Sequence, residues 1–301
     1  MKKFVLRTLV FLLLFVPLIY WTFSLADGYT DPFYTRFTTP RQNSLILGTS
    51  RAAQGLYPDV INKVLDNEIF NYAFTKAHSP FGPIYLNSIR KKIDQNAKNG
   101  LFIVTVDPWS ISSKAADPNN PTTFREVGLF LDRTGLVNSN PNPGYLTYSF
   151  NNKYYKLVFP DSSPMFLHTN GWLEVTIDMD SASVAERTKR KLIDYKTKDL
   201  LVYKFSALRL DYLIKTIKFL RQHGDVYLVR LPMNQGMMEV ENKLMPTFDN
   251  KMLDIAHLAS GYLDLTKHNT SFGYNDGNHL DKYSGKQVSK MIAEWIKGQK
   301  K

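Results

Sequence analysis

The feature that most constrains the fold is an alternation of strand-like and helix-like segments between residues 44 and 106. Short apolar runs at 44–47, 68–74 and 101–106 are separated by segments with the apolar spacing of helices. Parallel strands need helical crossovers, and strands covered on both faces read as nearly continuous apolar runs. The alternation therefore predicts an α/β fold with a mostly parallel, doubly wound sheet that is covered on both faces.

The same alternation resumes towards the C-terminus. Helices are predicted at 198–222 and within 239–258, strands at 225–231 and 262–265, and a last helix precedes the end of the chain. The stretch between the two halves, 113–199, is rich in Pro, Asn, Ser and aromatic residues. It does not repeat the strand–helix pattern, so we expect an irregular insertion or cap over the sheet.

The N-terminus carries a segment that is suited to a membrane. Three basic residues come first: Lys2, Lys3 and Arg7. An uncharged run from 8 to 26 follows, which as a helix is close to the thickness of a bilayer core. The basic residues place the N-terminus inside and the remainder outside the cytoplasm. The run is longer than a usual signal core, which favours a retained signal anchor over residues 1–27; cleavage after Ala26, giving a secreted protein, is the alternative.

Residues 28–43 contain Gly28, Pro32 and Pro40 without apolar periodicity, so we expect a stalk. The α/β domain would then span 44–298 and include the insertion.

Composition excludes several function classes. The chain has no cysteine, which rules out disulfide scaffolds, thiolate zinc sites and cysteine nucleophiles. Its histidines lack metal-ligand spacing and it has no phosphate-binding glycine loop, so neither a metal nor a cofactor is expected. The net charge of +11 is spread along the chain and the N-terminus is an export signal, which argues against nucleic acid as a partner. Anionic lipid or an acidic polysaccharide fits better, and a generally basic solvated surface is the plainest alternative.

Three polar residues that follow predicted strands have the chemistry of a serine hydrolase. Ser50 follows the first strand, and Asp276 and His279 follow the fifth. The carboxyl ends of parallel strands share one edge, where ligands bind in open α/β sheets. A serine hydroxyl needs an imidazole to take its proton, and the imidazole needs a carboxylate to hold its tautomer. The alternative is that Ser50 caps a helix and His279 is a surface histidine beside Asp276.

These residues resemble the motifs of the SGNH (GDSL-type) hydrolases. In that family the nucleophile stands in a Gly-Asp-Ser block after the first strand, and an Asp-x-x-His block precedes the last helix. The matching segments here are 48–50 and 276–279, and the resemblance covers about 44–110 and 200–298. It implies an α/β fold of the three-layer α/β/α sandwich kind with a mostly parallel, flavodoxin-like sheet, and ester hydrolysis or acyl transfer outside the cytoplasm. The most similar members in build are membrane-anchored proteins that add or remove acyl groups on exported cell-envelope polysaccharides.

The resemblance is incomplete at the oxyanion hole. The family uses the nucleophile's N–H, a second-block glycine N–H and a third-block Asn side chain. Here the second block is 71–74, which begins with Asn71 and has Ala73 in place of the glycine, so a backbone N–H is still expected there. The third block is replaced by 107–110, which contains no Asn. Losing one such donor costs about 10²–10³ in rate.

Arg51 or a group from the insertion is therefore the candidate replacement donor, although an arginine here is more typical of an ion pair. His78, Asp107 and Trp109 also follow strands and are candidates for lining the substrate pocket. The alternative for His78 is a structural or solvated histidine, and the alternative for Trp109 is an indole that covers the core. The missing Asn also leaves a second function open, a non-catalytic glycan-binding or assembly protein.

Overall fold

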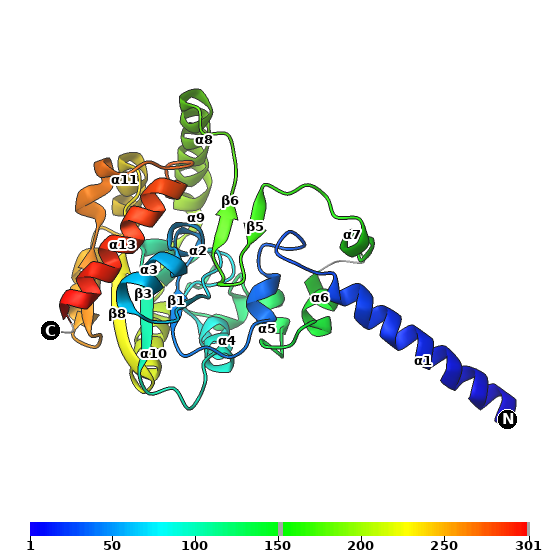
Figure 1. Cartoon of the computed structure of the whole chain (residues 1–301). Helices are drawn as coiled ribbons and strands as arrows, with labels where there is room; N and C mark the ends of the chain where they lie inside the picture. Colours follow the sequence, from blue (N-terminus) through cyan, green and yellow to red (C-terminus); the bar gives the residue numbers. More distant parts are fainter. Residues whose placement is uncertain (150–152, 300–301) are drawn as a thin grey trace.

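The computed structural model describes residues 1–149 and 153–299 and contains one central five-stranded parallel sheet (Figure 1). The strands lie in the order β2-β1-β3-β8-β9. Their bounds are β1 Leu45–Leu47, β2 Phe70–Asn71, β3 Gly100–Thr105, β8 Gly224–Arg230 and β9 Gly261–Asp264. The predicted parallel α/β architecture is confirmed. Each strand lies within a few residues of its predicted position. Buried apolar runs indicate where a strand lies, but they define its first and last residues less precisely.

The strand order creates one reversal in the direction of winding. From β1 the chain first adds β2 on one side, and then β3, β8 and β9 on the other. Sheets wound in this way place ligands beyond the carboxyl ends of the strands at the point of reversal. That point lies between β1 and β3, which pair in register from Leu45↔Phe102 to Leu47↔Val104.

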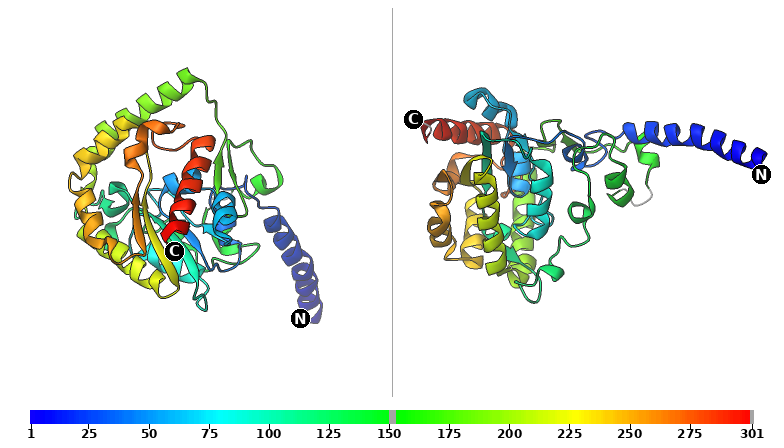
Figure 2. Two further views of the ribbon diagram at one scale, coloured as in Figure 1. Left: turned by 60° about the vertical axis from the view of Figure 1, so that its left-hand side comes forward. Right: turned by 90° about the horizontal axis from the view of Figure 1, so that it is seen from below.

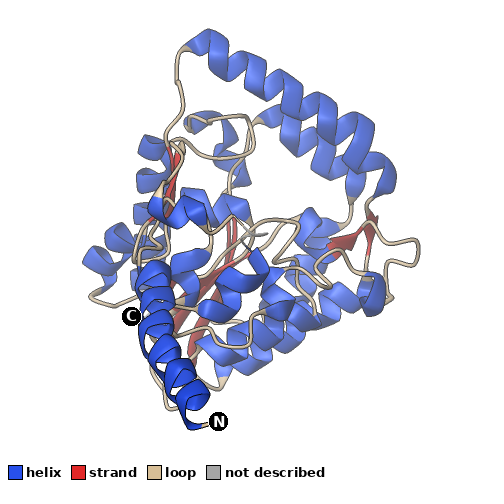
Figure 3. Cartoon of the chain, turned by 90° about the vertical axis from the view of Figure 1, so that its right-hand side faces the viewer, coloured by secondary structure: helices blue, strands red, loops and turns tan. Residues whose placement is uncertain are grey.

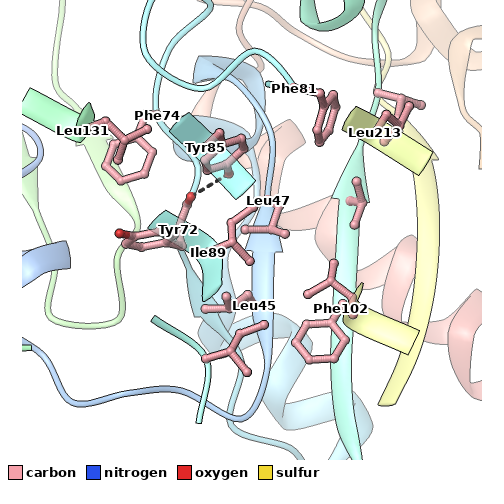
Figure 4. Packing of buried hydrophobic residues seen from close by; sticks show 14 of the residues in the cluster. Leu45, Leu47, Tyr72, Phe74, Phe81, Tyr85, Ile89, Phe102, Leu131 and Leu213 are labelled. Atoms are coloured by element: carbon pink, nitrogen blue, oxygen red, sulfur yellow. Dashed lines mark hydrogen bonds between the residues drawn. The ribbon is translucent and has the colours of Figure 1, made fainter. Parts of the chain in front are cut away.

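Helices cover both faces of the sheet, as Figure 3 shows around the red strands. On one face, side chains of α4 Pro83–Lys92, α10 Ala207–Arg221 and α12 Phe248–Ala256 join alternate strand residues in one core. On the other face, α2 Ser50–Gly55, α3 Pro58–Leu65 and α13 Lys282–Gln299 pack on the remaining strand residues. Figure 4 shows part of the first core, including Leu45, Leu47 and Phe102.

Two predicted helices differ in extent. The helix expected over 198–222 begins only at Ala207, because Ser206 caps it by accepting a hydrogen bond from the Arg209 N–H at 3.2 Å. The residues before it form the short elements α9 Leu200–Val202 and β7 Lys204–Phe205. The helix expected within 239–258 is two helices, α11 Gln235–Leu244 and α12. They are separated around Pro246, because proline disfavours a continuous helix.

The insertion is more regular than expected. Its elements are β4 Ser112–Ser113, the 3₁₀ turn η3 Pro121–Thr123, α5 Phe130–Arg133, α6 Pro143–Ser149, α7 Tyr155–Val158, β5 Met165–Leu167, β6 Leu173–Val175, α8 Ser181–Asp194 and the π-helical turn η4 Tyr195–Asp199, which continues α8. Asp180 caps α8 by accepting from the N–H groups of Ala182 and Ser183. No side chain of α8 is fully buried, and Figure 1 shows the helix standing at the edge of the domain.

The segment at 28–43 is packed into the domain and differs from the expected stalk. Tyr34 and Phe37 are 1% and 0% exposed and belong to the first core. Buried Arg36 donates to the carbonyl oxygens of Asn71 (3.0 Å) and Gly171 (2.6 Å), which ties the edge of the sheet to the β5–β6 hairpin. Burial of the apolar side chains at 33, 34 and 37 holds this segment against the domain, although prolines and polar residues surround them in the sequence.

Helix α1, Lys2–Ser24, is the helix in the described part of the chain that is long and apolar enough to cross a membrane. Its most apolar 18-residue stretch has a mean hydropathy of 2.2, and the helix has no buried residue. Both views in Figure 2 show it projecting from the body of the protein. It is therefore compatible with a membrane anchor or signal anchor.

Candidate active site

Ser50, His279 and Asp276 form one hydrogen-bonded row at the carboxyl edge of the sheet. The Oγ of Ser50 lies 2.8 Å from Nε2 of His279. The other ring nitrogen, Nδ1, lies 2.9 Å and 3.1 Å from the two carboxylate oxygens of Asp276. Ser50 begins α2 just after β1, and the other two residues lie between β9 and α13. Segments 229 residues apart thus meet at hydrogen-bond distance.

Charge determines which way these hydrogen bonds run. Burial opposes ionisation of Asp276, but the His279 ring and the Lys191 ammonium outweigh it, so the pKa of this carboxyl lies well below its usual value. Burial lowers the pKa of His279, although Asp276 acts in the opposite direction. At neutral pH the pair is therefore a carboxylate and a neutral imidazole. The carboxylate can only accept, so Nδ1 carries the proton and Nε2 is free to accept the Ser50 hydroxyl proton.

The loop before Ser50 is held by a glycine and a tyrosine. Gly48 has φ +143°, and a Cβ there would lie 1.8 Å from Thr105 Oγ1, so this tight passage between β1 and β3 requires glycine. The Tyr85 hydroxyl accepts from the Gly48 N–H at 3.1 Å and donates to the Tyr72 carbonyl oxygen at 2.8 Å, the bond drawn in Figure 4. The Ser79 hydroxyl donates to the Gly48 carbonyl oxygen at 2.7 Å. These contacts fix the direction in which Ser50 leaves the strand.

The segment that carries Asp276 and His279 is a closed turn. The Asn275 N–H donates to the His279 carbonyl oxygen at 2.8 Å. One oxygen of Asp276 accepts from the backbone N–H groups of Asn278 and His279, each at 3.0 Å. An aspartate that binds its own turn in this way is held in one rotamer. The i, i+3 spacing of the Asp-x-x-His segment thereby places the carboxylate under the imidazole.

Arg51 points away from the position of an oxyanion donor. Its Nε and Nη2 both donate to Oδ1 of Asn278, at 2.9 and 2.6 Å, and Nη2 lies 2.7 Å from Glu241. Arg51 and Glu241 are 5% and 1% exposed, so this is a buried ion pair. The expectation of an ion-pairing arginine describes Arg51 better than that of an oxyanion donor. Its partners Asn278 and Glu241 were not among the sequence candidates.

Ala73 also differs from its expected role. Its N–H donates to Oδ1 of Asn71 at 3.1 Å and is therefore occupied. The Asn71 side-chain amide donates in turn to the carbonyl oxygens of Ala52 and Leu56, so this buried residue braces α2. By contrast, the N–H groups of Thr75 and Lys76 donate to no described residue, and both residues line the cleft beside Ser50. The N–H of Ser50 is the first in α2 and has no acceptor within the helix.

Asp107, Trp109 and His78 have structural contacts. Asp107 caps a 3₁₀ turn by accepting from the Ser110 N–H at 2.8 Å and also accepts from the Thr49 hydroxyl at 3.2 Å. Trp109 is 2% exposed, with its indole edge-on to Tyr195 and Tyr203.

His78 is bonded through Nδ1 to the Thr75 hydroxyl at 2.8 Å and packs on the rings of Phe33 and Phe130. Burial lowers its pKa to about 4. None of His78, Asp107 and Trp109 is among the residues that line the cleft beside Ser50.

The insertion supplies a residue that sequence reasoning missed. Lys191, on α8, forms an ion pair with Oδ2 of Asp276, and its Nζ lies 3.5 Å from Nδ1 of His279. Arg187, one turn earlier, donates to the carbonyl oxygen of Asn275 at 3.0 Å. The sequence signal was present, since basic residues at 187, 190 and 191 have the spacing of one helical face.

The triad opens into a cleft of about 500 Å³. Its walls are the loop at 75–77, the β9–α13 turn and α8, with one arginine from the insertion at 125. Among the described residues, no cluster of His, Asp and Glu is arranged to hold a metal ion. The chemistry that the arrangement offers is therefore a hydroxyl, a base and an orienting carboxylate at a solvent-accessible cleft.

No protein-family model matches this chain, and no curated protein matches it at a significant level.

Proposed function

We propose that the chain is a membrane-anchored, extracytoplasmic serine esterase or O-acyltransferase that acts on acyl groups of a cell-envelope polysaccharide. The observation that carries the proposal is the row Ser50 Oγ, His279 Nε2, His279 Nδ1 and Asp276, with distances of 2.8 and 2.9 Å. Distances of this size are those of an activated nucleophile with its base and orienting acid. The position at the winding reversal of a parallel sheet adds support.

In the proposed reaction, Nε2 of His279 takes the hydroxyl proton while Ser50 Oγ bonds to the ester carbonyl carbon. The tetrahedral oxyanion then collapses, and the leaving alkoxide takes the proton from Nε2. Water or a sugar hydroxyl repeats the steps in reverse and frees Ser50. The N–H of Ser50 and an unoccupied N–H in the 75–76 loop are the donors we assign to the oxyanion, in place of Ala73.

An SGNH-type fold is part of this proposal. It is supported by the nucleophile after β1, by the Asp-x-x-His turn before α13 and by helices on both faces of the sheet. The extracytoplasmic location is supported by Lys2, Lys3 and Arg7 ahead of the apolar part of α1. The excess of basic residues is compatible with an anionic envelope surface.

A second candidate is a non-catalytic glycan-binding or assembly protein. It is favoured by the oxyanion region, where the Ala73 N–H is occupied and no Asn side chain replaces the third-block donor. A triad without its oxyanion donors would keep the fold and lose most of the rate.

Labelling of the full-length protein with a fluorophosphonate probe separates the two functions. We expect the wild type to be labelled, and Ser50→Ala and His279→Ala to lose labelling by about 10³-fold or more, because the triad residues act together. Exposed Ser271→Ala and His257→Ala serve as matched controls and should label like the wild type. A folded wild type that stays unlabelled, or equal labelling of Ser50→Ala, would support the binding protein instead.

A further inference from the structure

The cleft beside Ser50 contains more cations than carboxylates. Five basic side chains line it: Lys76, Arg125, Arg187, Arg190 and Lys191. Three acidic side chains face them: Asp194, Asp199 and Asp276. Four of the five cations come from the insertion, which therefore gives the cleft its charge.

Each carboxylate in the cleft already has a cationic partner. Asp199 pairs with Lys76, Asp276 pairs with Lys191, and Asp194 lies 2.6 Å from Lys198 outside the cleft. Within the described residues, the three arginines form no ion pair with a carboxylate. The unbalanced charge of the cleft thus resides in three guanidinium groups.

Two of these arginines lie on the face of α8 that looks toward the triad. Arg187 donates to the carbonyl oxygens of Asn275 and Asp178, so its guanidinium is oriented beside the turn that carries Asp276. Arg190 comes three residues after Arg187 on the same face of α8, next to Lys191, and is exposed. Arg125 faces them from the loop that precedes α5.

The opposite side of α8 has a different character. Lys189 of α8 and Lys196 of the π-helical turn η4 that continues it line a separate, mostly apolar groove with Val184, Leu192 and Ile193. The helix therefore divides its positive charges between a cleft that ends at Ser50 and a groove that does not. A general need for solubility would not require this arrangement of arginines around the nucleophile.

We propose that Arg125, Arg187 and Arg190 bind an anionic group, a carboxylate or a phosphate, on the substrate whose ester reaches Ser50. Guanidinium groups match both anions through paired hydrogen bonds, and a cleft of one sign concentrates anionic ligands. The inference rests on the proposed function, because the ester is assigned to Ser50. It adds that the polymer or acceptor carrying the acyl group is an anionic one.

Binding is tested with full-length Ser50→Ala protein in a non-ionic polyoxyethylene detergent, where no turnover occurs. The probes are fluorescent oligogalacturonate, fluorescent inorganic polyphosphate and a fluorescent neutral maltooligosaccharide of similar length, followed by anisotropy. We expect the anionic probes to bind and the neutral probe to bind at least about tenfold more weakly. The tighter of the two anionic probes identifies the group as a carboxylate or a phosphate.

The substitutions Arg187→Gln and Arg190→Gln, introduced together into the Ser50→Ala protein, should weaken binding of the anionic probe by about tenfold or more. Each of them removes a charge-assisted contact. The matched pair Lys189→Gln and Lys196→Gln removes the same charge from the other side of α8 and of the π-helical turn η4 that continues it, and should change binding less than about twofold. Helical content from circular dichroism confirms that α8 persists in both pairs. Equal losses in the two pairs, or equal binding of the neutral probe, would overturn the proposal.

Failure of this inference is distinguishable from failure of the proposed function. The fluorophosphonate probe is small and reports on Ser50 and His279, whereas the anisotropy experiment uses protein without the nucleophile. Labelling without selective anion binding overturns the anionic substrate and retains the hydrolase. Selective anion binding without labelling retains the arginine site and assigns it to the glycan-binding function.

Discussion

The guanidinium of Arg51, which follows Ser50, donates two hydrogen bonds to Oδ1 of Asn278, which precedes His279. The immediate neighbours of the proposed nucleophile and base are thus joined directly. Glu241 on α11 lies 2.7 Å from Nη2, one of the two nitrogens that donate to Asn278. A buried contact of this kind aligns two segments that the chain separates widely, so Arg51 is a positioning residue for the triad.

Replacing Asn278 with Ala tests this contact. We expect a loss of about 1–3 kcal/mol in the free energy of unfolding, because the buried guanidinium loses its acceptor. The fluorophosphonate labelling rate should fall as well, since Ser50 and His279 lose their connection. Arg51→Met should cost more, about 3–5 kcal/mol, because it leaves Glu241 buried beside Arg230 alone. A double-mutant cycle measured by urea unfolding is the check, and additive effects would show that the two side chains are not coupled.

Lys191 is expected to tune the pH dependence of labelling. Its charge is among the causes that lower the pKa of His279, after burial. The base is active only when neutral, so activity should be lost as the pH falls through the pKa of His279, below its ordinary value of 6.5. Replacing Lys191 with Met removes a nearby positive charge and should move this acid limb to higher pH.

The measurement is the labelling rate between about pH 4 and 8, the range around an ordinary histidine. Lys191→Arg should retain the low acid limb, because it keeps the charge. Lys189→Met removes a lysine from the other side of α8 and should leave the profile unchanged. An acid limb at the same pH in Lys191→Met and the wild type would show that Lys191 does not influence the base.

Gly48→Ala should destabilise the protein and slow labelling together. The added methyl group would lie 1.8 Å from Thr105 Oγ1, and φ +143° is strained for alanine. Backbone strain alone costs about 1–3 kcal/mol, and the contact with β3 adds to it. Gly135→Ala is the matched control, because a Cβ there has no atom within 4 Å. Urea unfolding of both variants decides the point, and equal stabilities would show that the loop before Ser50 can relax.

The parallel sheet and the meeting of Ser50 with His279 could be predicted because both follow from local pattern. Apolar runs specify buried strands, and polar residues after parallel strands share one edge of the sheet whatever the loops do. Side-chain direction could not be read in the same way. Arg51 turns to Glu241, and Ala73 gives its N–H to Asn71, because both choices depend on which elements pack beside α2.

The insertion shows the same limit more clearly. Prolines and asparagines in 113–199 suggested irregular structure, although the segment ending at Asp194 has capping and charge spacing typical of a helix. Its position over the triad is a tertiary fact that no local pattern contains. Lys191 could therefore be recognised as a basic residue of a helix, but its contact with Asp276 could not be predicted.

A buried lysine predicts an unusual pH dependence of stability. Lys92 on α4 is 0% exposed, and burial lowers its pKa from 10.5 to about 7. Its ammonium donates to the carbonyl oxygens of Thr39 and Val137, and so joins the segment at 28–43 to the insertion. Above about pH 7 the folded protein releases this proton while the unfolded chain keeps it until about pH 10.5.

The unfolded state therefore binds more protons in that window, so the contribution of Lys92 to the free energy of unfolding should rise with pH, by at most about 1.4 kcal/mol per unit. Lys92→Met removes this titration. The free energy of unfolding of the wild type minus that of Lys92→Met should therefore increase between about pH 7 and 9.5. This window lies below the range in which tyrosines ionise. Lys98→Met, an exposed change, should show a constant difference. Urea unfolding at several pH values is the measurement. A constant difference for Lys92→Met as well would mean that the lysine stays charged, held by its carbonyl partners against the cost of burial.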